Sequence, residues 1–312
     1  MRFYDIFNGD ADGLCALHQL RLADPRTATL ITGVKRDISL LARVTPEPGD
    51  EFTVLDISLD TNREALLGAL QTGAHVSYFD HHFAGEIPQH RLLEVHIDTT
   101  ATICTSLIVD RHLGGRHRTW AVVGAFGDNL RIQAYSAAAA LGLDPADVET
   151  LRELGECLNY NAYGANLTDL HFHPAHLYLR MQPFADPLKF CAQAPEVDAL
   201  RNASADDLRQ AQALPIERVG EDALAVFMPE AAWSRRIVGT FANELSRRNA
   251  DRTVALLVRD GAGYQVSLRA SADGKQAMHL LARQFESGNG RARSAGIQFL
   301  PEPDVARLLA LL

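Results

Sequence analysis

The 312-residue sequence has few cysteines and no long apolar run, and both absences narrow the class of protein. No segment approaches the ~18 apolar residues that a membrane-spanning helix needs, and the first residues, Met1–Asp5, are not the core of a signal peptide. The cysteines are widely spaced and form no Cys-x-x-Cys pair, so we expect free thiols in a reducing compartment. We therefore expect a soluble, cytoplasmic protein. The four cysteines are Cys15, Cys104, Cys157 and Cys191.

An excess of basic residues is also absent. The chain carries 39 acidic and 30 basic residues, which gives a net charge of -9. Because duplex binding needs many phosphate contacts from Lys and Arg, this balance argues against a general surface for long duplex nucleic acid. It allows a short nucleotide in a metal-lined pocket, since bound cations reverse the local charge. The length is sufficient for two domains with cores of their own.

Acidic residues follow several of the strands that the sequence predicts. These strands, at 3–7, 29–32, 52–55 and 75–79, alternate with helical patterns at 14–22, through 40–41 and at 61–70. Such alternation favours an α/β fold with a doubly wound, mainly parallel sheet, in which ligands bind outside the carboxyl ends of the strands. The residues expected at those ends are Asp10, Asp12, Asp56, Asp80, His81 and His82.

Three short segments at these ends offer metal ligands or structural caps. Asn8–Gly13 places two acids in a glycine-flanked loop before a helix, where an aspartate can bind a ligand or cap the helix. Asp80–His82 joins a carboxylate to two imidazoles, which are ligands for divalent transition metals, although a surface acid with two histidines is the alternative interpretation. A further acid, Asp128, follows the buried segment 120–126, and Asp98 is expected to cap or support the helix at 101–112.

The second half predicts a smaller α/β domain with a mixed sheet. A helical pattern at 144–159 closes the first domain, and His171, His173 and His176 are expected to face solvent or form hydrogen bonds. We predict a first domain at 1–185, a linker helix region at 186–215 and a second domain at 216–312, with the active site in the cleft between the domains. Strands are expected at 223–228, 254–258 and 264–268, with a helix at 233–247.

Two arginines of this second domain are candidates for binding substrate phosphate. Arg269 ends a predicted strand, and Arg291 follows a glycine-rich turn formed by Gly288, Asn289 and Gly290. A guanidinium matches phosphate oxygens, and glycine lets the backbone approach a ligand closely. Arginines that contact only water are the alternative interpretation.

Four segments occur in the order of the four motifs of the DHH phosphoesterases. They are Asn8–Gly13, Val54–Asp56, Asp80–His82 and Gly127–Asn129. The segment Gly288–Gly296 resembles a degraded form of the glycine-rich loop of the DHH-associated C-terminal domain, so that the resemblance covers nearly the whole chain. Many members place a histidine just before the first acid pair, whereas this chain has Asn8 there, closer to the acid-only pattern of RecJ-like members.

The resemblance implies a centre of two divalent ions, usually Mn²⁺, with Mg²⁺ or Co²⁺ as substitutes. Asp10 would hold the first ion and Asp56 would bridge both ions. His82 would face the substrate phosphate, and Asp80 would orient the histidine pair, which makes these two the expected catalytic residues. The second ion would be held by Asp12, His81 and Asp128.

We therefore expect a metal-dependent phosphodiesterase that uses metal-activated water to hydrolyse short linear oligonucleotides or dinucleotides, such as pGpG, to mononucleotides. Alternatives in the same class are a 3′-phosphoadenosine 5′-phosphate phosphatase, a cyclic-dinucleotide phosphodiesterase and a polyphosphatase. A non-catalytic nucleotide-binding sensor is the alternative of another class, because Asn8 and Arg291 replace histidines of the family. The expected partner is a short nucleotide, without a membrane or long duplex, and a homodimer stays open.

Overall fold

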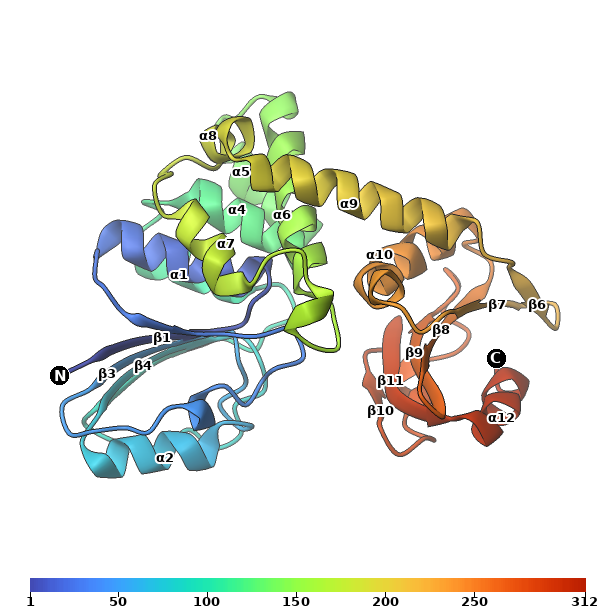
Figure 1. Ribbon diagram of the computed structural model, residues 1–312, viewed down its shortest axis with the longest axis horizontal. Coiled ribbons are helices and arrows are strands. Elements are labelled where there is room, and N and C mark those ends of the chain that lie inside the picture. The colour runs from blue at the N-terminus through green and yellow to red at the C-terminus, as the bar shows by residue number, and fades with distance from the viewer. The chain divides into compact units, whose positions relative to one another are not determined.

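The first half of the chain is built on a five-stranded sheet in which every neighbouring pair of strands is parallel (Figure 1). The strand order is β2-β1-β3-β4-β5, so β1 and β3 are neighbours at the centre, with β4 between β3 and the edge strand β5. All four strands predicted for this region are present. The strands are β1 (Phe3–Phe7), β2 (Thr29–Ile31), β3 (Glu51–Leu55), β4 (His75–Asp80) and β5 (Leu93–Ile97).

Both faces of this sheet are covered, because its strands carry apolar residues on both sides. Ile6, Val54 and Tyr78 are buried in one core with apolar residues of α2, whereas Phe7 packs against Tyr178 on α7. In Figure 1, α2 lies on one side of the sheet and α1 and α4 lie on the other. The helices of this part are α1 (Ala11–Ala23), α2 (Arg63–Thr72), α3 (Thr105–His112), α4 (Arg118–Gly127), α5 (Arg131–Ala139), α6 (Pro145–Ala162), α7 (Pro174–Met181) and α8 (Pro187–Gln193).

Two predicted segments differ from the structure, and a third gains a defined type. The helix expected through 40–41 is a single 3₁₀ turn, Leu41–Arg43, in which Leu41 is buried with Leu40 in the core beside α2. The segment 120–126 is buried as predicted and lies within helix α4, so Asp128 follows a helix. The glycine-rich turn at 288–290 is a short strand.

The second half contains a six-stranded sheet of order β10-β11-β9-β8-β7-β6, in which only β7 and β8 run parallel. Its helices are α10 (Ala232–Arg248), α11 (Met278–Ala282) and α12 (Val305–Ala310). The parallel sheet and this mixed sheet confirm the predicted α/β fold class. The strands are β6 (Glu217–Val219), β7 (Ala223–Met228), β8 (Thr253–Asp260), β9 (Gly263–Arg269), β10 (Gly288–Gly290) and β11 (Ser294–Pro301).

The computed structural model describes residues 1–312, which divide into two compact units. The N-terminal unit is Met1–Arg201 and the C-terminal unit is Asn202–Leu312. Helix α9 (Pro195–Gln212) contains the boundary between them. None of the helices combines the length and the apolar composition that crossing a lipid bilayer requires.

Candidate active site

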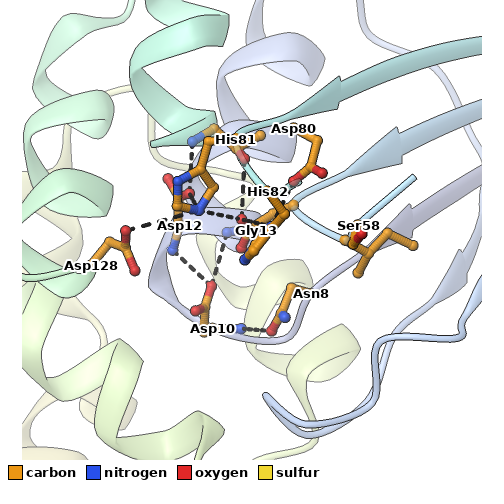
Figure 2. A network of polar contacts seen from close by, with 12 residues as sticks. Asn8, Asp10, Asp12, Gly13, Ser58, Asp80, His81, His82 and Asp128 are labelled. Atoms are coloured by element: carbon orange, nitrogen blue, oxygen red, sulfur yellow. Dashed lines mark hydrogen bonds and ion pairs between the residues drawn. The ribbon is translucent and has the colours of Figure 1, made fainter. Parts of the chain in front are cut away.

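The acids predicted at the strand ends gather at one place in the N-terminal unit (Figure 2). Asp10 follows β1, Asp56 follows β3, and Asp80 is the last residue of β4. Each of these side chains is at most 2% exposed. Parallel neighbouring strands place their carboxyl ends at one sheet edge, which is why residues far apart in the sequence come together here. We call Asp10, Asp12, Asp56, Asp80 and Asp128 the acid cluster.

Asp10 caps the helix that follows it. It is the N-cap of α1, and its Oδ1 accepts hydrogen bonds from the backbone N–H groups of Asp12 (3.0 Å) and Gly13 (3.1 Å). Its Oδ2 accepts a hydrogen bond from the ammonium of Lys35, and the two groups form an ion pair. Asp10 therefore combines the two roles that the sequence left open, a structural cap and a charged group in the cluster.

Asp12 connects α1 to the start of α3. Its Oδ2 accepts the backbone N–H of Thr105 and its Oδ1 that of Ser106, both at 2.7 Å. The Ser106 hydroxyl donates to the same carboxylate. A carboxylate at a helix N-terminus is stabilised by the unpaired N–H groups there. Its Oδ2 also lies 4.0 Å from His81 Nε2, so one side chain both holds α3 and borders the cluster.

Asp56 has an uncommon backbone conformation. Its φ is +60°, a left-handed value that costs energy for residues other than glycine, and such strain concentrates at functional sites. Its backbone N–H donates to Phe79 O at 3.0 Å, which ties the end of β3 to β4. Its Oδ1 accepts the hydroxyl of Thr105 at 3.1 Å and lies 3.4 Å from His81 Nε2.

The two histidines of the Asp-His-His segment have different surroundings. The side chain of His81 is 9% exposed and points among the acids, whereas that of His82 is 46% exposed. Asp80 Oδ1 lies 2.7 Å from His82 Nδ1, and this hydrogen bond leaves Nε2 of the ring as its outer nitrogen. Asp80 Oδ2 is buried without a hydrogen-bond partner. Asp80 thus orients His82 directly.

Asp128 completes the cluster from the end of α4. Helix α4 closely approaches α1 and α6 through glycines, because a Cβ on Gly127 would lie 2.3 Å from the Ala11 Cβ and one on Gly155 would lie 2.9 Å from the Gly127 N. The chain then turns at Asn129, which has a φ of +61°. Asparagine tolerates this left-handed conformation better than most residues do. These contacts bring Asp128 Oδ2 to 3.9 Å from His81 Nε2.

One part of the site has the spacing of a metal-ligand set. Around His81 Nε2 lie oxygens of Asp56 at 3.4 Å, Asp128 at 3.9 Å and Asp12 at 4.0 Å. The ligand atoms of Asp12, His81 and Asp128 all lie within 4.8 Å of one another, and Asp56, His81 and His82 form a second such set that shares His81. Adjacent ligands of an octahedral ion with bonds of about 2.1 Å stand about 3 Å apart, so inward movement would close either set on one ion. Their chemistry, several carboxylate oxygens and one imidazole, suits Mn²⁺ or Mg²⁺.

Burial and mutual repulsion shift the acids' pKa values apart. Burial, reinforced by the charges of Asp12 and Asp10, raises the pKa of Asp56 well above its ordinary value. Burial also raises the pKa of Asp128 to about 6, although the charge of Lys35 opposes it. Burial alone would raise the pKa of Asp10, but the charge and hydrogen bond of Lys35 lower that pKa to about 2. Carboxylates that repel one another in this way favour a cation between them.

Four residues of this site were not predicted from the sequence, namely Lys35, Thr105, Ser106 and Asn159. Lys35 lies shortly after β2, at the same sheet edge as the acids, and is one of only three lysines in the chain. A rule that considered every charged residue shortly after a strand, and not only acids, would have selected Lys35 too. Thr105 and Ser106 begin a helix, where such residues are common caps, so nothing distinguishes them. Asn159 lies within α6 and carries no signal.

The predicted substrate-binding residues of the C-terminal unit are placed as follows. Arg269 ends β9, and its guanidinium donates to Asn243 Oδ1 (2.7 Å) and Ser267 Oγ (3.0 Å). Gly288, Asn289 and Gly290 form β10, which pairs with β11, and Asn289 Oδ1 accepts the Gly290 N–H. Arg291 follows on the exposed turn, where its backbone N–H donates to Ser294 O at 2.7 Å.

Two further histidine groups lie outside the acid cluster. His171 stacks on Tyr160 and hydrogen-bonds its hydroxyl at 2.9 Å, while His173 caps α7 by accepting the Ala175 N–H. These contacts give both histidines structural roles. At the edge strand β5, Glu94, His96 and His112 have ligand atoms close enough to hold a metal ion. Glu94 and His112 are exposed there.

No protein-family model matches the sequence, and no functionally characterised sequence matches it. Solved structures do match. RecJ from Thermus thermophilus, in complex with Mn²⁺, superposes with a TM-score of 0.60 at 20% identity over 99% of this chain, which spans about half (52%) of that RecJ chain. A pGpG-specific phosphodiesterase from Vibrio cholerae superposes with a TM-score of 0.56 at 15% identity, covering 99% of this chain and 96% of its own.

Identities this low show the fold alone. The chain has the fold of the RecJ exonucleases and of that phosphodiesterase. A second manganese-bound RecJ structure has the same fold, with a TM-score of 0.52 at 18% identity over 99% of this chain and 88% of that one. The fold that the resemblance to the DHH phosphoesterases implied is therefore confirmed. The activity and the role of each site residue do not follow from it.

Proposed function

We propose that this protein is a divalent-metal-dependent phosphodiesterase of the DHH type that hydrolyses short linear oligonucleotides or dinucleotides, such as pGpG, to mononucleotides. The observation that carries the proposal is the acid cluster, in which the carboxylates of Asp12 in the first turn of α1, Asp56 after β3 and Asp128 at the end of α4 lie around His81 Nε2. The fold shared with a pGpG-specific phosphodiesterase over nearly its full length supports the same substrate class. A net charge of -9 favours a short substrate over long duplex nucleic acid.

Asp12, His81 and Asp128, with Asp56 beside them, would hold the metal, and Mn²⁺ is the ion we expect, with Mg²⁺ or Co²⁺ as substitutes. When bound, such an ion supplies positive charge against the phosphoryl oxygens and lowers the pKa of water. The residues around it keep those ligands in place. Thr105 donates to Asp56, and the first N–H groups of α3 donate to Asp12, so hydrogen bonds orient both carboxylates.

His82 is the residue we assign to the substrate phosphate. Burial lowers its pKa, but the hydrogen bond and charge of Asp80 outweigh burial and keep the pKa above its ordinary value. The imidazolium form is thereby favoured, and its outer N–H can donate to a phosphoryl oxygen as negative charge develops there. His82 is half exposed and so reachable by a substrate, whereas Asp80 is fully buried and acts on His82.

The C-terminal unit carries the arginines that we assign to substrate phosphate. Arg291 is exposed and carries a guanidinium that can bind phosphate in a two-pronged manner, and Arg269 is the second candidate. The β10 strand adds exposed backbone groups at Asn289 and Gly290 that a nucleotide could approach. These roles are proposals from the residue types and their positions.

The test is a substrate panel incubated with Mn²⁺: pGpG, pApA, longer oligonucleotides, cyclic dinucleotides, adenosine 3′,5′-bisphosphate and polyphosphate. We expect release of mononucleotide from pGpG or pApA, abolished by EDTA. Asp56→Ala should reduce hydrolysis by at least about 10³-fold. Asp60→Ala is the matched control, because Asp60 is an exposed aspartate paired with Arg63. Full activity of Asp56→Ala, or turnover of polyphosphate alone, would contradict the proposal.

A second candidate is a nucleotide-binding sensor without turnover. One observation favours it: Asp10, a residue expected to hold a metal ion, is paired with Lys35. The same panel separates the two functions. A sensor would bind a dinucleotide in a calorimeter and release no product over hours with Mn²⁺ present.

A further inference from the structure

The two sides of the acid cluster are filled differently. On one side, the ligand atoms of Asp12, His81 and Asp128 all lie within 4.8 Å of one another, and Asp56 Oδ1 lies 3.4 Å from His81 Nε2. On the other side, the ammonium of Lys35 is already bound to Asp10 Oδ2 and lies 3.9 Å from Asp128 Oδ1. The same ammonium donates to Asn159 Oδ1 at 3.2 Å. A positive charge of the chain itself therefore lies between two of the expected metal ligands.

The backbone on both sides of Lys35 holds it there. Its N–H donates to Ala162 O at the end of α6, at 2.9 Å. Its carbonyl accepts the side-chain amide of Asn8 at 3.2 Å. Asn8 stands where many members of the resembled family have a histidine, and here it fixes the lysine segment. The side chain of Lys35 is 29% exposed, so most of its length is enclosed.

We propose that Lys35 is a permanent cation of the centre, which takes the place of one of the two expected metal ions so that the protein binds a single divalent ion. This inference rests on the proposed metal-dependent function. It changes the role predicted for Asp10, from a ligand of the first ion to the counter-ion of Lys35. The one ion then lies at Asp12, His81 and Asp128, with Asp56 Oδ1 3.4 Å from His81 Nε2.

The bonding of Asp10 supports this assignment. Its Oδ1 accepts two backbone N–H groups of the first turn of α1, and its Oδ2 accepts the lysine ammonium. These bonds occupy three of the about four acceptor sites of the carboxylate, and a second ion at the remaining site on Oδ2 would stand beside an ammonium of like charge. The ammonium of Lys35 neutralises the Asp10 carboxylate without a metal ion. The same ammonium would repel a second metal ion strongly at such short range in a buried site.

The assignment has a consequence for substrate binding. An ammonium is present at every metal concentration, whereas an ion must be taken up from solution. Because Lys35 is partly exposed, its ammonium can contact a substrate phosphate as a point charge. We therefore expect metal dependence that follows a single binding step, with Lys35 supplying the second positive charge.

The test is the number of Mn²⁺ ions bound by the full chain, measured by mass spectrometry of metals after desalting and by calorimetric titration. Electron paramagnetic resonance gives an independent readout, since an isolated Mn²⁺ has a six-line spectrum and a coupled pair does not. We expect one ion and the six-line spectrum in the wild type. Lys35→Met should bind a second ion, because it keeps the aliphatic stem and frees Asp10 Oδ2. Lys35→Arg keeps the charge and should stay at one ion.

Lys189→Met is the matched control, because Lys189 is an exposed lysine of the same unit, and it should also stay at one ion. Two ions in the wild type, or one ion in Lys35→Met as in the wild type, would overturn the assignment. Should Lys35→Met fail to fold, the wild-type count and spectrum still decide. Two ions with active enzyme would refute the role of Lys35 alone, whereas no bound ion and no hydrolysis would refute the proposed function with it.

Discussion

The acid cluster of the N-terminal unit and the β10 strand of the C-terminal unit are both predicted functional regions, yet their atoms are held very differently. In the acid cluster, Asp12 and Asp80 are at most 1% exposed and hydrogen-bonded to other residues of the site. In β10, Asn289 and Gly290 are exposed, and the Asn289 side-chain oxygen accepts a hydrogen bond from the N–H of the very next residue.

This difference separates two ways of building a site. Buried carboxylates without geometry-fixing hydrogen bonds would be costly, so the fold that keeps them must also orient them. Exposed polar groups carry no such cost, and their arrangement is free to change when a ligand arrives. We expect substitutions in the acid cluster to change stability and chemistry together, and substitutions at the β10 surface to change substrate affinity alone.

The sharpest test of this contrast is Asp12→Ala. The change leaves the backbone N–H groups of Thr105 and Ser106 without their acceptor in a buried site. We expect the free energy of unfolding of the metal-free protein to fall by about 3 kcal/mol. Urea unfolding in EDTA, followed by circular dichroism, measures it. Asp98→Ala is the control, because that carboxylate bonds Thr100 within its own turn and should cost less than about 1 kcal/mol. Equal losses in both variants would contradict the contrast.

The variant Gly288→Ala tests whether β10, like the acid cluster, is held by close contacts with the rest of its unit. Such contacts would weaken the contrast between the two regions. A Cβ on Gly288 would lie 1.8 Å from the carbonyl oxygen of Ala282, so the backbone must shift. We expect a loss of about 2 kcal/mol in the unfolding of the C-terminal unit. Gly68→Ala in α2, where a Cβ meets nothing, should instead stabilise by about 0.5–1 kcal/mol. A neutral Gly288→Ala would show that β10 is not held by this contact.

Acid should affect the two units unequally, because His279 is the one histidine of the C-terminal unit. Burial lowers the pKa of His18 from 6.5 to about 4, against its hydrogen bond with Phe184 O. The unfolded chain therefore takes up this proton first, and the stability contribution is complete above pH 6.5 and lost as the pH falls towards 4.

At pH 5.5 the loss should be about 1.4 kcal/mol relative to neutral pH. His18→Gln keeps a donor for Phe184 O but cannot be protonated in this range. Between pH 7 and 5.5 the variant should therefore lose less free energy of unfolding than the wild type, and the difference should equal the contribution of His18. Urea unfolding of both proteins at the two pH values measures the difference. The same decrease in both proteins would show that His18 does not carry the effect.

The smallest effect on stability is expected at Arg291. Arg291→Ala should leave the free energy of unfolding within about 0.5 kcal/mol of the wild type, because the side chain is exposed. If Arg291 binds substrate phosphate, KM for pGpG should rise by about 5-fold with kcat unchanged. Arg293→Ala is a neighbouring exposed control. An unchanged KM would remove Arg291 from the substrate site.

Much of the fold was predictable because its strands and acids follow simple rules. The strands β1, β3 and β4 have apolar runs with an acid at or within three residues of the strand end, and parallel pairing then brings those acids together. Asp128 was predicted as an acid after a buried segment, but the segment is helical. Periodicity does not distinguish a short buried strand from a buried helix, and Gly124 and Gly127 obscured the helical pattern.

The parts that sequence could not supply depend on contacts between distant segments. That Asp12 would hold α3, or that Lys35 would bind Asp10, requires knowing that residues 93 and 25 positions apart meet. The strand conformation of Gly288–Gly290 depends on pairing with β11, while the residues themselves are typical of a turn. Local patterns predicted which residues carry charge, and tertiary pairing decided which charges touch.

The glycine contacts beneath Asp128 have a consequence for how the protein tolerates change. At Gly127 and Gly155 the main chains of α4 and α6 stand almost directly against each other, without side chains between them. The position of Asp128 relative to Asp10 and Asp12 is therefore set by direct packing of the α4 main chain against Ala11 and α6, which changes little when neighbouring apolar residues are exchanged. Variation can accumulate in the surrounding core while the spacing of the charged groups stays constant.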